Sequence, residues 1–147
     1  MTPSNQCYSL IKKFEGCVLH AYKDAVGIWT IGYGATFYED GSQVKDGDII
    51  TQERAEALLK RIVDAFAVKV DTYTNVVEQH QFDALVSFAY NVGVGAYHNS
   101  TLLKKVNANP NDLEIRAEFL KWNKAGGRVL SGLTDRRKKE AAYYFSA

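Results

Sequence analysis

The spacing of apolar residues in this chain changes near Thr51 and separates two kinds of predicted structure. After Thr51 the apolar residues recur every three or four positions, which predicts a long amphipathic helix with Thr51 as its N-cap. These residues are Ala55, Leu58, Leu59, Ile62, Val63, Phe66 and Val70. Before Thr51, residues 18–23 and 28–33 are rich in β-branched and aromatic side chains and flank a turn at 24–27. They predict a β-hairpin.

Helices are also predicted on either side of this hairpin region. Pro3 suits the start and Gly16 the end of a first helix at residues 3–15. Further helical patterns cover residues 78–91, 100–106, 113–124 and 133–145, and a third short strand is predicted at 43–45. The sequence therefore predicts an α+β, mainly helical fold.

The predicted elements group into two lobes of a single domain, residues 1–147. A small N-terminal β-hairpin lobe covers about residues 16–50, and a larger helical lobe covers about 51–147 and includes the first helix. We expect the active-site cleft to lie between the lobes, since ligands favour such places.

The charge balance argues against one broad class of function. The chain has 18 basic and 17 acidic residues, so its net charge of +1 does not suit nucleic-acid binding through overall charge. Neither a signal peptide nor a membrane-spanning run is visible, which predicts no stable membrane insertion and synthesis in the cytoplasm. Cys7 and Cys17 are expected to be packed thiols, with a redox switch as the alternative.

Three polar residues at the hairpin form a candidate catalytic group: Glu15, Asp24 and Thr30. Cleavage of a glycosidic bond needs two carboxyl groups in different environments. At a helix C-terminus the dipole disfavours ionised Glu15, which suits an acid, whereas backbone N–H groups in a turn keep Asp24 ionised. Thr30 is the lone hydroxyl on its strand face. Each residue also has a purely structural explanation: Glu15 as a solvated acid at a helix end, Asp24 as a turn residue and Thr30 as a residue that favours strands.

The motifs around these residues resemble those of the phage-type lysozymes, glycoside hydrolase family 24. The motifs are F-E-G at 14–16, A-Y-K-D at 21–24 and W-T-I-G-Y-G at 29–34, followed by similar blocks at 87–93, 99–103 and 122–133. The resemblance implies a lysozyme-like fold, with Glu15 as general acid and with Asp24 and Thr30 holding the water that attacks with inversion. One departure is Ala35, where many relatives carry histidine.

The resemblance also implies a substrate and partners. An endolysin-type muramidase would hydrolyse the bond between N-acetylmuramic acid and N-acetylglucosamine in bacterial peptidoglycan, without metal or cofactor, and lyse the cell. A holin-like membrane permeabiliser would release it from the host bacterial cytoplasm to the peptidoglycan, and we expect a monomer. Two alternatives stay open: a catalytically silent wall-binding module, and a lytic transglycosylase, which needs no water activator.

Other residues argue against a metal site and a serine hydrolase, and some suit sugar binding. His20, His80 and His98 lie too far apart in sequence for a zinc site, and no G-x-S-x-G motif occurs. The predicted substrate-binding residues, which could equally be packing or capping residues, are Tyr90, Asn91, Ser100, Trp122, Gly126 and Gly127. Residues 121–147 are basic, which predicts either attraction to the anionic wall or a solvated helix face.

Overall fold

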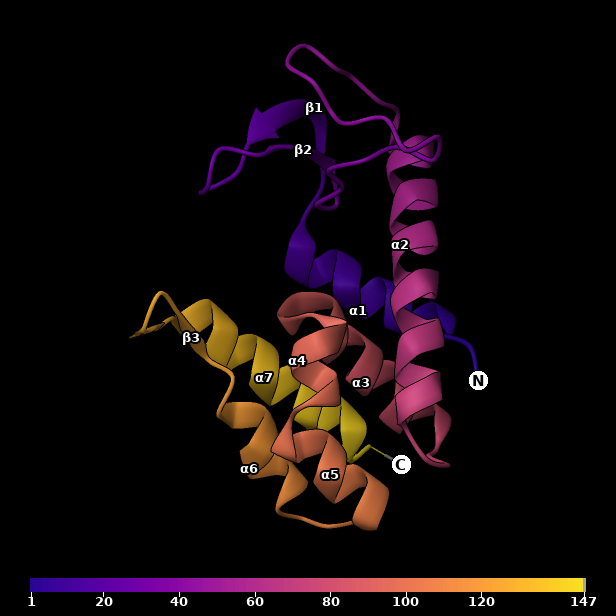
Figure 1. The fold of residues 1–147 in the computed structure, drawn as a ribbon, viewed down its shortest axis with the longest axis vertical. Helices are drawn as coiled ribbons and strands as arrows, with labels where there is room; N and C mark the ends of the chain where they lie inside the picture. Colours follow the sequence, from indigo (N-terminus) through magenta and orange to yellow (C-terminus); the bar gives the residue numbers. More distant parts are fainter. Residues whose placement is uncertain (147) are drawn as a thin grey trace. The chain divides into compact units, whose positions relative to one another are not determined.

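Helices dominate the computed structural model, which describes residues 1–146 (Figure 1). The helices are α1 (Asn5–Glu15), α2 (Gln52–Tyr73), α3 (Gln79–Val92), α4 (Val94–His98), α5 (Thr101–Ala108), α6 (Ile115–Leu120) and α7 (Ser131–Tyr144). The strands are β1 (Val18–Lys23), β2 (Trp29–Gly32), β3 (Lys124–Ala125) and β4 (Arg128–Val129). The predicted α+β, mainly helical fold class is confirmed.

The chain divides into two compact units. The N-terminal unit is Tyr8–Ala65, and the C-terminal unit comprises residues 1–7 and 66–146. The boundaries fall within α1 and α2, so each of these helices contributes residues to both units.

The N-terminal unit contains the predicted hairpin. Strands β1 and β2 pair antiparallel, with Lys23 opposite Trp29 and Tyr22 opposite Thr30, and the register shifts before Val18 pairs with Gly32. Beyond β2 the chain turns back sharply, because Ile31 and Ala35 exchange both backbone hydrogen bonds at 2.9 Å. The predicted hairpin is confirmed, but residues 43–45 form no strand: Gln43 makes only an isolated bridge to Phe37.

The predicted long helix is α2. Thr51 caps it by accepting a hydrogen bond from Arg54 N at 3.1 Å, as the sequence predicts. Within the N-terminal unit, α2 is tied to α1 by an ion pair of 2.6 Å between Lys12 and Glu56. Apolar side chains of both helices and of the hairpin segment are buried, including Ile11, Ile31, Leu58, Leu59 and Val63.

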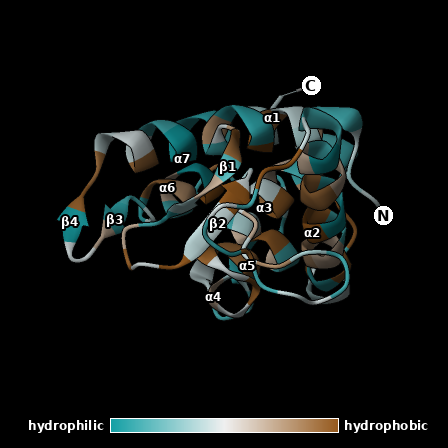
Figure 2. Ribbon diagram, turned by 90° about the horizontal axis from the view of Figure 1, so that it is seen from above, coloured by the Kyte–Doolittle hydropathy of each residue, from teal (hydrophilic) through white to brown (hydrophobic). Residues whose placement is uncertain are grey.

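The C-terminal unit is built around α3, whose central residues are buried. Helix α3 packs against α7, and α7 also packs against α6. Phe88 on α3 is fully buried and meets the rings of Tyr97, Phe119 and Trp122 at centroid distances of 6.2, 5.6 and 5.5 Å. Much of α7 is hydrophilic in Figure 2, although several of its charged residues are buried.

Two elements of the C-terminal unit, the β3–β4 hairpin and α4, were not predicted from the sequence. Residues 113–124 predict one helix, but α6 ends at Leu120 and the chain then forms the β3–β4 hairpin. Gly126 and Gly127 have φ of 58° and 78°, which is the left-handed pair that a tight two-residue hairpin turn requires. The short helix α4 was also missed. None of the helices in residues 1–146 is both long enough and apolar enough to span a membrane.

Candidate active site

Glu15 is the last residue of α1, and its carboxylate approaches the loop that follows β2. Gly16 ends the helix with φ of 66° and donates its N–H to Lys12 O at 3.1 Å. Glu15 Oε2 lies 3.9 Å from the position that a Cβ atom on Gly34 would occupy. Because Gly34 has no side chain, its backbone can pass close to this carboxylate.

Asp24 closes the turn between β1 and β2. Its Oδ1 atom accepts hydrogen bonds from the N–H groups of Val26 and Ile28, both at 2.9 Å. Its own N–H donates to Ile28 O, also at 2.9 Å. Within residues 1–146, no hydrogen bond reaches the second carboxylate oxygen, Oδ2. The side chain is therefore anchored through one oxygen and can use the other for chemistry.

Thr30 lies on β2 and is 5% exposed. Its Oγ1 donates a hydrogen bond to Ile28 O at 2.9 Å. A hydroxyl has only one proton, so any further partner of this oxygen must be a donor. The hydroxyl therefore offers an acceptor to a water molecule or a sugar hydroxyl.

The backbone of Ile28 connects two of the three predicted catalytic residues. Its N–H donates to Asp24 Oδ1, and its C=O accepts from Thr30 Oγ1. Asp24 and Thr30 thus both hydrogen-bond to the backbone of one residue, Ile28, whose own side chain is 50% exposed. The expectation that Glu15 faces this pair across room for one water stays a prediction.

Two predicted substrate-binding residues, Asn91 and Trp122, line one open cavity of about 430 Å³ in the C-terminal unit. Leu130 and Leu133 also line it, together with residues of β3. The predicted residues Gly126 and Gly127 lie nearby in the chain, at the tip of the β3–β4 hairpin.

The other two predicted substrate-binding residues have structural contacts. Ser100 is buried, where its Oγ accepts from Leu103 N at 3.0 Å and donates to Tyr97 O at 2.6 Å, so it caps α5. Tyr90 is half-buried, with its ring 5.4 Å from that of Phe66. Their predicted role in binding stays a prediction.

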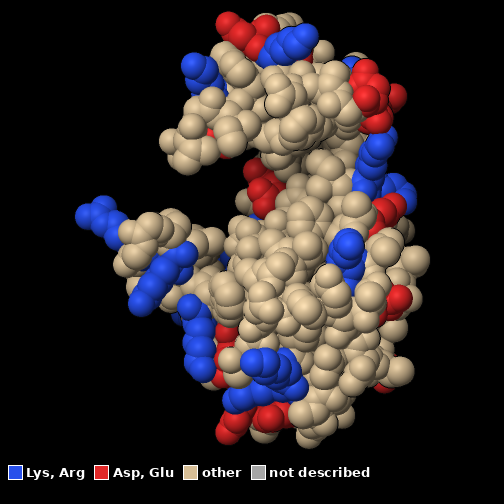
Figure 3. Space-filling model, viewed as in Figure 1, with Lys and Arg blue, Asp and Glu red and all other residues tan. Residues whose placement is uncertain are grey.

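The basic C-terminal segment differs from the expected solvated face. Arg136 and Arg137 on α7 are buried with Glu140, and they form ion pairs with it at 3.2 and 3.0 Å. The exposed bases of the segment are Lys121, Lys124, Arg128, Lys138 and Lys139. Lysine and arginine side chains gather on the face of the C-terminal unit that carries the β3–β4 hairpin (Figure 3). Any attraction to an anionic wall must therefore come from these exposed residues.

The structure also locates the cysteines and the candidate metal ligands. Cys7 is buried, with Sγ 3.6 Å from Asp83 O, and Cys17 is partly exposed, with Sγ 3.6 Å from Gln52 Oε1. Both are free thiols. Nowhere in residues 1–146 do three histidine, cysteine, aspartate or glutamate side chains gather as they would to hold a metal ion.

Comparison with known proteins identifies similar proteins over nearly the whole chain. The family model described as Phage lysozyme matches residues 12–140. The endolysin of Bacillus phage B103 is 46% identical over 99% of this chain, and the match includes 55% of that endolysin. This chain thus spans about half the length of that relative.

Solved structures share the fold. The endolysin from Escherichia coli O157:H7 phage FAHEc1 superposes with a TM-score of 0.91 at 39% identity, covering 99% of this chain and 94% of its own. The muramidase domain of SpmX from Asticaccaulis excentricus gives 0.85 at 31% identity, covering 98% and 97%.

Proposed function

Because this chain belongs to the phage lysozyme family, we propose that it is an endolysin-type lysozyme whose residues 1–147 form a single catalytic domain. Its substrate is bacterial peptidoglycan, and the bond cleaved is the β-1,4 linkage between N-acetylmuramic acid and N-acetylglucosamine. The similarity to a structure described as a muramidase domain supports this choice of bond. Hydrolysis of the wall would lead to lysis of the cell.

The arrangement of Asp24 and Thr30 on the backbone of Ile28 is the observation that carries this proposal. Asp24 Oδ2 and Thr30 Oγ1 are both acceptors, so a water between them would donate one proton to each. Its lone pairs then point away from both side chains. Asp24 takes the proton as this water attacks the anomeric carbon, which is general base catalysis.

Glu15 completes the proposed reaction as the general acid. It protonates the glycosidic oxygen of the leaving sugar while the water attacks the opposite face of the ring, which inverts the anomeric carbon. Inverting enzymes separate their two carboxyl groups by about 6.5–9.5 Å to leave room for the water. Proposed sugar contacts come from the predicted binding residues, of which Asn91 and Trp122 line one cavity.

Substitution of Glu15 tests the proposal. Glu15→Gln should lower the rate of wall hydrolysis by about a hundredfold or more, because an amide cannot supply the proton. Glu53→Gln, at an exposed glutamate of α2, is the matched control and should keep full activity. Near-normal activity of a folded Glu15→Gln variant would exclude Glu15 as the acid.

Mass spectrometry of the released muropeptides separates the remaining alternatives. Hydrolysis gives reducing sugars, a lytic transglycosylase gives anhydro sugars, and a wall-binding module releases neither. The proposed water-holding role of Asp24 and Thr30, which both bind the backbone of Ile28, favours the first product. An anhydro product from the wild-type chain would overturn the proposed role of Asp24 and Thr30.

Release to the wall is proposed to depend on a second protein. From the resemblance to endolysins we infer a holin-like membrane permeabiliser as that partner, and we infer that the lysozyme acts as a monomer. Expression of this chain alone should leave host cells intact, and co-expression with a pore-forming protein should lyse them. Lysis at the same rate in both cultures would contradict this part of the proposal.

A further inference from the structure

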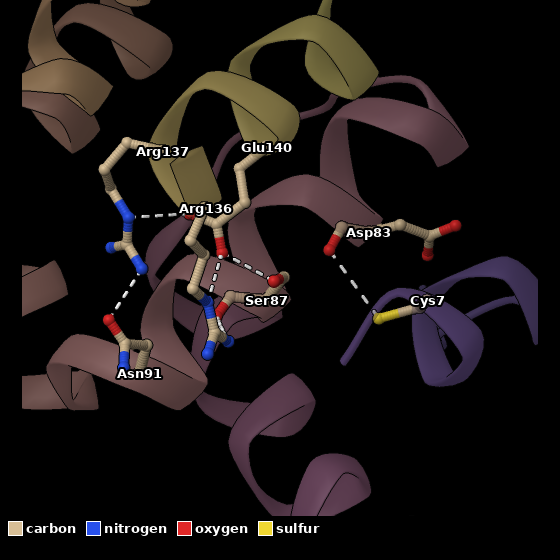
Figure 4. Close-up of polar contacts among 7 residues, drawn as sticks. All are labelled: Cys7, Asp83, Ser87, Asn91, Arg136, Arg137 and Glu140. Atoms are coloured by element: carbon tan, nitrogen blue, oxygen red, sulfur yellow. Dashed lines mark hydrogen bonds and ion pairs between the residues drawn. The ribbon is translucent and has the colours of Figure 1, made fainter. Parts of the chain in front are cut away.

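A buried ionic cluster joins α3 to α7 in the C-terminal unit (Figure 4). Glu140 Oε1 pairs with Arg137 Nε at 3.0 Å, and Glu140 Oε2 pairs with Arg136 Nε at 3.2 Å. Ser87 Oγ donates to Glu140 Oε2 at 2.5 Å. Arg137 and Glu140 are both 0% exposed. Burying these two charges costs much desolvation free energy, so the pair is weak evidence for a purely stabilising role.

Arg137 reaches from this cluster to Asn91, one of the predicted binding residues. Its NH2 nitrogen donates to Asn91 Oδ1 at 2.6 Å. Glu140 holds the Nε side of the guanidinium, and the ring of Phe88 lies 5.0 Å from its central carbon. Burial lowers the pKa of Arg137 to about 10, against the opposing effect of Glu140, so the group stays charged at neutral pH. The guanidinium is therefore held at two of its edges, by Glu140 and Asn91, and on one face, by the ring of Phe88.

This contact determines which way the Asn91 amide points. A guanidinium only donates hydrogen bonds, so the amide oxygen must face Arg137 and the amide nitrogen must face away. Asn91 is exposed, and within residues 1–146 its Nδ2 donates no hydrogen bond. Asn91 thus presents an oriented N–H donor at the surface.

The surroundings of this donor suit an amide carbonyl with an apolar neighbour. Asn91 lines the cavity of about 430 Å³ with the aromatic ring of Trp122 and the aliphatic side chains of Val92, Leu130 and Leu133. A donor beside aromatic and aliphatic surface fits a carbonyl group attached to a methyl or methylene group. Peptidoglycan carries such groups both on its N-acetylated sugars and in its peptides.

We propose that Arg137 is a positioning residue that holds the Asn91 amide to donate a hydrogen bond to an amide carbonyl of peptidoglycan in this cavity. This inference rests on the proposed function for its substrate. Glu140 acts one step further back, by fixing the guanidinium that orients the amide.

Asn91→Asp separates the structural contact of this residue from its binding role. The carboxylate still accepts from Arg137 and gains an ion pair, but it no longer offers an N–H donor. Thermal stability should stay the same or rise, whereas affinity should fall about tenfold, as expected for one lost hydrogen bond. Asn99→Asp places the same charge at an exposed asparagine outside the cavity and should keep wild-type affinity.

Calorimetric binding to two probes, measured in Glu15→Gln protein to prevent turnover, identifies the source of the carbonyl. One probe is an N-acetylglucosamine oligomer, which has no peptide, and the other is a peptide-bearing muropeptide. A sugar acetamide predicts weaker binding of both probes to Asn91→Asp, and a peptide carbonyl predicts weaker binding of the muropeptide alone. Unchanged binding of both probes would overturn the inference while leaving hydrolysis by the wild-type chain, and so the proposed function, intact.

Arg137 is tested through a double-mutant cycle. A lysine ammonium cannot contact Glu140 and Asn91 at the same time in the way that the planar guanidinium does. Arg137→Lys should therefore lower muropeptide affinity in the wild-type background. In the Asn91→Ala background the same substitution should leave affinity unchanged. An equal loss of affinity in both backgrounds would show a general structural effect and reject the positioning role.

Discussion

Asp24 has two functions that substitution can separate, because one of its oxygens builds the turn and the other is proposed to hold water. Asp24→Asn keeps an oxygen that can accept from Val26 N and Ile28 N, but it removes the negative charge. Asp24→Ala removes both the acceptor and the charge. The two variants should therefore lose activity alike and differ in stability.

The stability difference follows from the two hydrogen bonds of 2.9 Å to Asp24 Oδ1. Hydrogen bonds to charged groups contribute about 1.5–3 kcal/mol each in sheltered sites. Asp24 is only half-buried, so solvent screening reduces each to about 1 kcal/mol. Asp24→Ala should thus cost about 2 kcal/mol and lower the Tm by about 4–8 °C, whereas Asp24→Asn should cost under about 1 kcal/mol.

The activity loss should be the same for both variants. Removal of a general base lowers the rate of hydrolysis by about 10²–10⁴-fold. Turbidity of a peptidoglycan suspension gives the rate, and thermal unfolding followed by circular dichroism gives the stability. The control is Asp40→Ala: Asp40 Oδ1 also accepts from a turn N–H, that of Ser42 at 2.9 Å, outside the candidate site. This variant should lose some stability and keep its activity.

Two results would refute the reasoning on Asp24. Asp24→Asn with more than about a tenth of wild-type activity would show that the charge does not serve as the base. Asp24→Ala as stable as Asp24→Asn would show that the turn hydrogen bonds to Oδ1 contribute nothing measurable.

Three further predictions follow from other contacts. Thr30→Val should reduce activity less than Asp24→Asn, because the hydroxyl is proposed to orient water without taking its proton, and a steeper loss in wall hydrolysis assays would contradict this role. Burial and the hydrogen bond to Asp48 raise the pKa of Tyr38 to about 12, so its contribution to stability is complete below about pH 10 and lost as the pH rises through about 12. Tyr38→Phe should remove this part of the alkaline decline in urea unfolding, and an unchanged decline would reject it. Phe88→Ala should cost about 3–5 kcal/mol in the same assay, since its ring is fully buried among three others, and a cost below about 1 kcal/mol would contradict that packing.

Sequence periodicity predicted the long helices because their apolar stripes repeat over many turns. The β3–β4 hairpin escaped the same reasoning, since strands of two residues are too short to show alternation and Gly126 and Gly127 serve equally well as a helix end. Turn chemistry predicted Asp24 as an acceptor of backbone hydrogen bonds, but no local pattern identifies Ile28 O as the partner of Thr30.

The buried charges of α7 were the hardest feature to predict. Arg136, Arg137 and Glu140 lie in a run of charged residues that is typical of a solvated helix face. They are buried because α7 packs against α3, which lies about fifty residues earlier in the sequence and supplies partners such as Ser87 and Asn91. A sequence without tertiary information contains no signal for such a pairing, apart from the spacing of opposite charges along the helix.

The connection of two candidate catalytic side chains through the backbone of Ile28 has an evolutionary consequence. Position 28 serves Asp24 and Thr30 with its peptide N–H and C=O, which every residue except proline possesses. The isoleucine side chain projects half into solvent and makes neither hydrogen bond. Selection can therefore vary the side chain at this position while the backbone hydrogen bonds to Asp24 and Thr30 are inherited unchanged.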